Sequence, residues 1–174
     1  MKAAAVGLAI ALAVAVQTTL ARFVVPGLAA VDLVLVVVVY VALRSGPVSG
    51  LLAGTLGGLV QDVLSSGIVG IGGLAKTVVG FVTGVIAAQF IVAHVFSRIL
   101  MFVGATLLHA TVFFGLYALV EAPRFGVPYA AILGEAVGNA AVGVVAFHLV
   151  ELLPGMVERR RAGRSRVRLT RRME

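Results

Sequence analysis

Long apolar stretches follow one another along almost the whole chain, broken only by short segments that carry charge, proline or glycine. A helix needs about 20 mostly apolar residues to cross the hydrocarbon core of a bilayer. Charged residues make up only 12% of the sequence and hydrophobic residues 61%, whereas about 25% of the residues in soluble domains are charged. Because so few polar residues cannot cover a surface that faces water, a soluble globular fold is excluded and an integral membrane protein is predicted.

The breaks between these stretches predict an all-α bundle of six transmembrane helices. A β-barrel is not expected, because no stretch alternates polar and apolar residues and only helices or closed barrels satisfy the backbone within lipid. The first stretch is longer than the apolar core of a signal peptide, so it is interpreted as a retained span. The third is short, which leaves five spans as the alternative count. The predicted spans are 3–21, 28–43, 48–63, 69–93, 99–120 and 127–153.

The positive charge lies at the end of the chain. Residues 159–174 contain eight arginines and one glutamate, and the rest of the sequence is neutral, which accounts for the net charge of +7. This pattern predicts a transmembrane bundle over residues 1–155, ending at Pro154-Gly155, and a basic cytoplasmic tail over residues 156–174. The tail arginines are expected to contact anionic lipid, with an acidic cytoplasmic protein as the alternative and no nucleic acid. They are Arg159, Arg160, Arg161, Arg164, Arg166, Arg168, Arg171 and Arg172.

The basic residues also predict the orientation of the bundle. Lysine and arginine in short loops favour the cytoplasmic side of a membrane. An even number of spans places Lys2, Arg44 and Arg98 on the same side as the basic tail, and only Arg22 and Arg124 on the other. Both termini are therefore predicted to be cytoplasmic.

Small residues recur at every fourth position in several spans, and residues four apart share one face of a helix. Small side chains allow membrane helices to approach closely, so these positions are predicted to pack helix against helix within the bundle. The glycines are Gly46, Gly50, Gly54 and Gly58, then Gly80 and Gly84, then Gly134 and Gly138. A weaker alanine stripe in the first span is a candidate for docking the helix of a partner, and it comprises Ala5, Ala9 and Ala13.

Several polar side chains fall inside the predicted spans, where ionisable groups are costly unless they face a partner. A pair between Lys76 and either Glu135 or Asp62 is expected to hide charge and fix the helix register. A substrate or proton path and a contact with a partner are the alternatives. A proton pump is disfavoured, because only His109 and Asn139 fall near the middle of the membrane and the asparagine side chain does not titrate. The predicted intramembrane polar residues are Asp32, Asp62, Lys76, His109, Glu135 and Asn139.

No pattern of catalytic residues is found. The chain has no cysteine, which removes thiolate metal sites and cysteine nucleophiles. Ser65 and Ser66 have no histidine or aspartate at the spacing of a nucleophile triad, and the three histidines follow no metal-ligand pattern. No enzyme activity, cofactor or metal is therefore expected.

Four motifs follow one another in the segment from Asp32 to Gly84. They are Asp-Leu at the head of the second span, a third span of stepped glycines that ends in Gly-Leu-x-x-Asp, a Ser/Gly turn, and a Gly-x-x-x-Leu start to the fourth span. In this sequence these features include Asp32-Leu33, Gly58-Leu59 through Asp62, and Gly70 through Leu74. In this order and spacing they resemble the MreD family of rod shape-determining membrane proteins, whose usual proline before the aspartate is replaced here by Val31.

The resemblance implies a non-enzymatic scaffold in the bacterial cytoplasmic (inner) membrane, in the elongasome that controls cell shape and lateral peptidoglycan synthesis. It would bind the bitopic protein MreC, and through it act with MreB, RodA and a class B penicillin-binding protein. The family is also similar in fold to the substrate-binding subunits of energy-coupling-factor vitamin transporters, which supplies the alternative function. The predicted outer loops are short and nearly bare of aromatic and hydrogen-bonding residues, which favours the scaffold.

Overall fold

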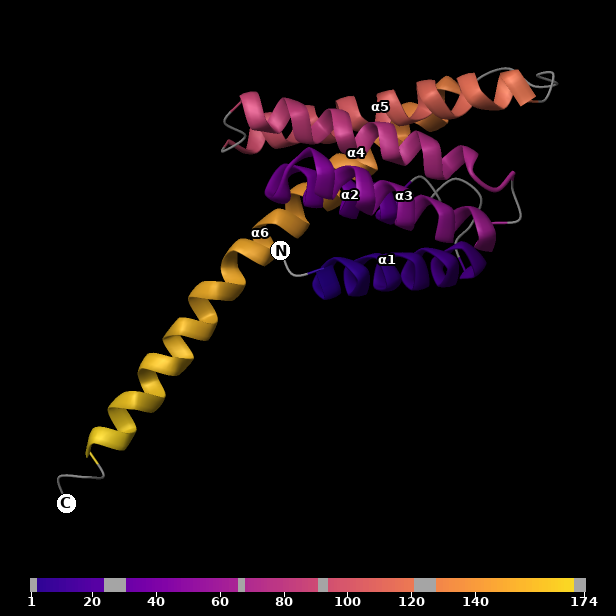
Figure 1. Cartoon of the computed structure of the whole chain (residues 1–174). Coiled ribbons are helices and arrows are strands. Elements are labelled where there is room, and N and C mark those ends of the chain that lie inside the picture. Colours follow the sequence, from indigo (N-terminus) through magenta and orange to yellow (C-terminus); the bar gives the residue numbers. More distant parts are fainter. Residues whose placement is uncertain (1–2, 24–30, 66–67, 91–93, 121–127, 171–174) are drawn as a thin grey trace.

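A computed structural model of the chain describes residues 3–23, 31–65, 68–90, 94–120 and 128–170, and the side chains of 4–19, 31–65, 68–90, 94–120 and 128–151. The described residues form helices joined by short connections and contain no strand, so the all-helical prediction is confirmed (Figure 1). The helices are α1 (Ala3–Phe23), α2 (Leu33–Ser45), α3 (Pro47–Leu64), α4 (Ile71–Gln89), α5 (Val95–Val120) and α6 (Tyr129–Thr170).

Among the residues whose side chains are described, four segments are long and apolar enough to cross a membrane: Pro47–Leu64, Ile71–Gln89, Val95–Val120 and Tyr129–Glu151. Two further helices, α1 and α2, have shorter described apolar segments, Ala4–Thr19 and Leu33–Ser45. These lengths fit a membrane protein built as a helical bundle, while the count of six spans stays a prediction.

Local capping sets the starts of several helices. Helix α2 begins at Leu33, later than the predicted start of the second span at residue 28. The carboxylate of Asp32 sets this start, because it accepts a hydrogen bond from the Leu35 N–H at 3.0 Å. An aspartate in this position satisfies an N–H group that the first turn leaves unpaired. The turn from α2 to α3 passes through Gly46, whose φ of +86° favours glycine, and Pro47 then opens α3.

Two predicted boundaries are wrong. The break between α4 and α5 lies earlier than the expected 94–98, because α4 already ends at Gln89 and α5 begins at Val95 and contains Arg98. The expected stop at Pro154-Gly155 is not found either, because α6 continues to Thr170. Proline removes one hydrogen bond and tends to kink a helix, but the helical backbone continues on both sides of this proline.

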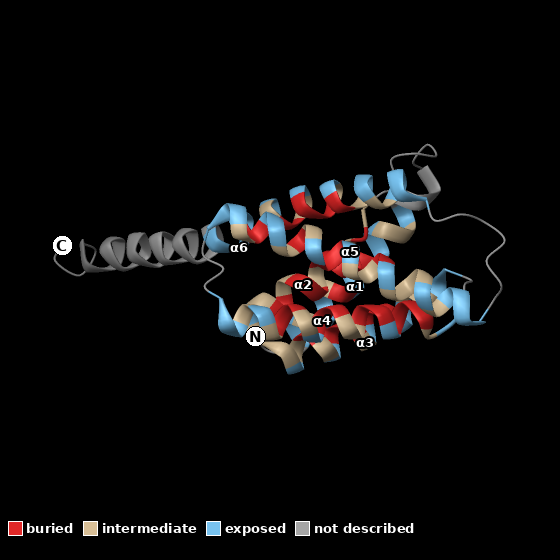
Figure 2. Cartoon of the chain, turned by 90° about the horizontal axis from the view of Figure 1, so that it is seen from above, coloured by how far each residue is buried: buried red, intermediate tan, exposed pale blue. Residues whose placement is uncertain are grey.

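The valine-rich helix α2 is the centre of the bundle and contacts each of the other five helices. Figure 2 shows that the buried residues gather on the faces that the helices turn toward one another. Val34, Val38 and Val41 pack with residues of α1 and α3, whereas Leu35, Val36 and Val39 pack with residues of α4, α5 and α6. Because α2 is covered on several sides, nearly all its side chains are apolar.

Candidate functional site

Glycines bring α3 and α4 into direct backbone contact. A Cβ atom on Gly50 would lie 2.9 Å from the carbonyl carbon of Gly80, and a Cβ atom on Gly54 would lie 2.6 Å from that of Lys76. Side chains do not occupy such short distances, so these positions require glycine at the present helix separation. The other glycines in this contact are Gly58, which faces Gly73, and Gly84, which faces Pro47.

Other predicted packing glycines have a different environment. Gly46 has no atom within 4 Å of the position of a Cβ atom, and it serves the turn into α3. On α6, Gly134 is exposed and Gly138 is partly buried. The close approach of α6 to α5 is instead at Gly143, where a Cβ atom would overlap the ring of Phe102. Gly143 does not continue the four-residue spacing of Gly134 and Gly138, so the sequence pattern did not indicate it as a packing position.

The alanine stripe on α1 does not form one open face. Ala5 is exposed, Ala9 is partly buried, and Ala13 is buried in the core cluster that includes Val34 and Val38 of α2. Residues four apart advance by about 40° around a helix of 3.6 residues per turn, so the stripe turns away from its starting face. Ala13 is therefore unavailable to a partner's helix.

Lys76 pairs with Asp32, and neither of the two expected partners is correct. The Nζ atom of Lys76 lies 2.7 Å from Oδ2 of Asp32 and 3.3 Å from Nε2 of His109. Both charged side chains are more than nine-tenths buried. The pair joins the start of α2 to α4, so the ammonium is compensated where it would otherwise be costly.

Asn139 connects this ion pair to α5 and α6. Its Oδ1 atom accepts the backbone N–H of Asp32 at 2.8 Å, and its Nδ2 atom donates to the hydroxyl of Thr106 at 3.1 Å. Nδ2 also lies 3.5 Å from Glu135 Oε1, one turn earlier on α6. The amide therefore uses both its acceptor and its donors to hold three helices together.

Asp62 has a local role at the start of α4. Its Oδ2 atom accepts the backbone N–H groups of Gly70 at 2.8 Å and Gly73 at 2.9 Å. Carboxylates are favoured at helix N-termini, where N–H groups are unpaired and the helix dipole is positive. The side chain of Asp62 thus binds backbone N–H groups at the start of α4 and does not pair with Lys76.

A cavity of about 360 Å³ opens beside these polar groups. It lies at the end of the bundle where α1, α3 and α5 finish and α2, α4 and α6 begin. Its polar lining comes from Gln17, Asp32, Gln61, Asp62, Ser65, Lys76, His109, Tyr117 and Glu135. The aromatic lining was not predicted, because it comes from helix α5 and not from a loop, and it consists of Phe113, Phe114 and Tyr117.

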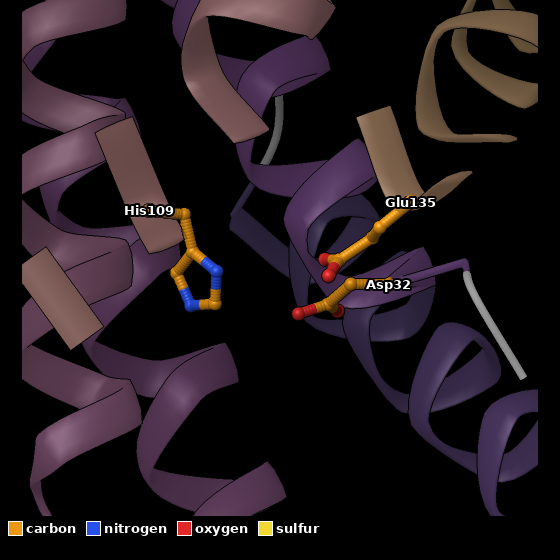
Figure 3. A group of neighbouring side chains, drawn as sticks. All are labelled: Asp32, His109 and Glu135. Atoms are coloured by element: carbon orange, nitrogen blue, oxygen red, sulfur yellow. The ribbon is translucent and has the colours of Figure 1, made fainter. Parts of the chain in front are cut away.

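Three residues of this cavity have the donor types of a metal site. One ligand atom from each of Asp32, His109 and Glu135 lies within 4.8 Å of the other two. Figure 3 shows the three side chains extending toward one another from the start of α2, from α5 and from α6. The Lys76 ammonium, however, already contacts two of the three. A cation bound by all three groups would have to displace it, so the described geometry favours the internal ammonium.

A second polar cluster, which the sequence did not predict, ties α5 to α6 at the opposite end of the bundle. Arg98 forms two hydrogen bonds to the Glu151 carboxylate, at 2.6 and 3.2 Å. Its guanidinium also lies 4.6 Å from the centre of the Phe147 ring, a distance at which cation–π attraction is favourable. His94 and His148, near this end, are exposed.

Some predicted residues lie outside the described part of the chain. The side chains of the tail arginines, from Arg159 to Arg172, belong to this group, as do Lys2, Arg22 and Arg124. Their predicted contacts with lipid and their predicted sides of the membrane stay predictions.

Comparisons with known proteins assign no family to this chain. No protein-family model matches it, and neither a curated protein nor a solved structure matches it. The grounds for its function are therefore its own residues and the geometry in which the fold holds them.

Proposed function

We propose that this chain is an MreD-like, non-enzymatic scaffold of the bacterial inner membrane that binds MreC. Through MreC it would act with MreB, RodA and a class B penicillin-binding protein in lateral peptidoglycan synthesis. In this proposal all six helices span the membrane, both termini are cytoplasmic, and the cavity opens toward the outer side.

The observation that carries this proposal is that residues of the MreD-like segment make close contacts between α2, α3 and α4. Asp32 caps α2 and binds Lys76. Gly54 of the stepped series lies against the backbone of Lys76, and Asp62 caps α4. Because α2, α3 and α4 depend on these residues for their packing, the resemblance concerns the frame of the protein and not an isolated pattern.

The polar groups of the described bundle support a scaffold for a second reason. Asp32 pairs with Lys76 of α4, and its backbone N–H donates to Asn139 of α6, so these polar groups are bonded inside the bundle. A proton relay needs a chain of titratable groups across the membrane. In the described residues the titratable groups that line the cavity and the Arg98–Glu151 pair lie at opposite ends of the bundle.

Co-purification of MreC tests the proposal. The full chain, with an affinity tag, is co-expressed with the MreC of the same bacterium and solubilised in mild detergent. We expect MreC to be retained in stoichiometric amount. The matched control is an MreC whose single membrane helix is replaced by an apolar helix of unrelated sequence, and its retention should be lost. Equal recovery of both forms, or of neither, would contradict a scaffold that grips this helix.

The cavity favours a second candidate, the substrate-binding subunit of an energy-coupling-factor-type transporter. Its volume of about 360 Å³ falls within the range of about 300–1,000 Å³ that is typical of small-molecule sites. Native mass spectrometry of the detergent-purified chain separates the two candidates. A tightly retained vitamin-sized molecule without MreC supports the transporter subunit, whereas retention of MreC supports the scaffold.

A further inference from the structure

We propose that the cavity binds an organic cation that carries N–H donors, such as a primary ammonium or an amidinium group. This inference goes beyond the scaffold role and does not depend on it. Three observations carry it: the charge balance of the lining, the hydrogen-bond acceptors left in it, and its aromatic wall.

The lining holds more negative than positive groups. The carboxylates of Asp32, Asp62 and Glu135 line the cavity together with one ammonium, that of Lys76. Asp32 and Lys76 compensate each other at 2.7 Å, and Asp62 is bound by two backbone N–H groups. Among the described residues Glu135 forms no salt bridge, and its hydrogen bond to Asn139 is long, at 3.5 Å. An ammonium or amidinium group beside Glu135 would give this carboxylate a direct partner.

A second acceptor lies in the same cavity. The Oε1 atom of Gln61 is buried and has no hydrogen-bond partner among the described residues. A buried acceptor without a partner costs free energy that a bound donor recovers. The Gln61 and Glu135 oxygens can thus each accept a further hydrogen bond. A ligand with N–H donors would supply these bonds, whereas a carboxylate or phosphate has no such donors.

The wall of the cavity suits the rest of such a ligand. Phe113 and Tyr117 stack one turn apart on α5, with ring centres 6.2 Å apart, and Phe114 meets Phe113 edge to face. The faces of aromatic rings attract cations and also pack against apolar groups. The cavity therefore combines an acidic, acceptor-lined part with an aromatic part, as small-molecule sites often do.

Three probes of similar shape test the proposal on the purified full chain by isothermal titration calorimetry. Benzamidine is a cation with N–H donors, benzamide is its neutral analogue, and phenyltrimethylammonium is a cation without N–H groups. We expect benzamidine to bind at least about tenfold more tightly than either of the others, because charge-assisted hydrogen bonds are the stronger kind. Equal binding of benzamidine and benzamide, or no binding of benzamidine, would overturn the proposal.

Variants assign the binding to this cavity. Glu135→Gln removes the charge with little change of shape and should weaken benzamidine binding about tenfold or more. Gln61→Met removes only the neutral acceptor and should weaken it about threefold, which keeps the test decisive if Glu135→Gln does not fold. The matched control is Glu151→Gln, on the same helix about 24 Å away along its axis. An unchanged dissociation constant in both cavity variants, or an equal loss in the control, would refute the assignment.

Two sources could supply such a cation, a soluble amine or the headgroup of phosphatidylethanolamine. Benzamidine binding is therefore also measured in nanodiscs of phosphatidylcholine alone and of phosphatidylcholine with phosphatidylethanolamine, which have the same net charge. Weaker apparent binding in the second lipid identifies the headgroup as a competitor, whereas equal binding identifies a soluble amine. MreC retention by Glu135→Gln, measured in parallel, should be unchanged, so that failure of this inference is distinguished from failure of the scaffold.

Discussion

The ammonium of Lys76 on α4 lies 2.7 Å from the carboxylate of Asp32 at the start of α2, and both groups are buried. Asp32 therefore has two roles, because its other carboxylate oxygen caps α2 by accepting the Leu35 N–H at 3.0 Å. One side chain thus fixes where α2 begins and which helix lies beside it. This relationship connects the local sequence to the packing of the whole bundle.

Loss of the Lys76 ammonium should destabilise the bundle strongly. Lys76→Met leaves the Asp32 carboxylate buried without its cation, which typically costs about 3–5 kcal/mol. The measurement is thermal unfolding in detergent, followed by the fraction that elutes as a monodisperse peak. The double variant Lys76→Met/Asp32→Asn, which leaves no buried charge at this pair, should be more stable than Lys76→Met alone. A double variant that is less stable than the single one would show that the pair is not the source of the effect.

A methyl group at Gly54 should force α3 and α4 apart. The added Cβ atom would lie 2.6 Å from the carbonyl carbon of Lys76 and 2.8 Å from the nitrogen of Thr77, and overpacking of this kind costs about 1–3 kcal/mol. Gly104→Ala on α5 is the matched control, because nothing lies within 4 Å of its Cβ position. The control should be neutral or slightly stabilising, since alanine favours helix over glycine. Equal stability of the two variants, measured in the same unfolding assay, would argue against direct backbone contact.

Asn139→Ala should loosen the junction of α2, α5 and α6. It leaves the Asp32 N–H and the Thr106 hydroxyl without their bonds to the amide, and unpaired buried polar groups cost about 1–3 kcal/mol each. Thr111→Ala is the control, because this exposed hydroxyl donates to the Leu107 carbonyl of its own helix. Hydrogen exchange should increase in the first turn of α2 in Asn139→Ala and stay unchanged in Thr111→Ala. If hydrogen exchange in the first turn of α2 stayed unchanged in both variants, the Asn139 amide would not anchor this helix.

Single cysteines can test the orientation without interference, because the chain has none of its own. Ser65, at the end of α3, and His94, just before α5, are both exposed. With cytoplasmic termini and six spans, Ser65→Cys should react with a membrane-impermeant maleimide in intact spheroplasts, whereas His94→Cys should react only after lysis. The reverse pattern would mean that the bundle is inserted the other way, and labelling of both in intact spheroplasts would contradict six spans.

The sequence alone determined the kind of molecule and the outline of its helices. Apolar length and the scarcity of charge require helices that suit a bilayer, and the predicted third span, 48–63, lies within one residue of α3 at both ends. The glycine spacing also indicated a helix-packing surface on α3, since residues four apart share a face. These are local properties, which depend only on neighbours along the chain.

The tertiary structure alone decided which residues meet. The cavity draws its polar groups from separate helices, so no spacing in the sequence could show that Lys76 contacts Asp32 and His109 while Glu135 forms no salt bridge among the described residues. For the same reason, the close approach at Gly143 depends on where the Phe102 ring of α5 lies. Partners of buried charges are set by how helices are arranged around one another, and that arrangement follows from the packing of all their faces together.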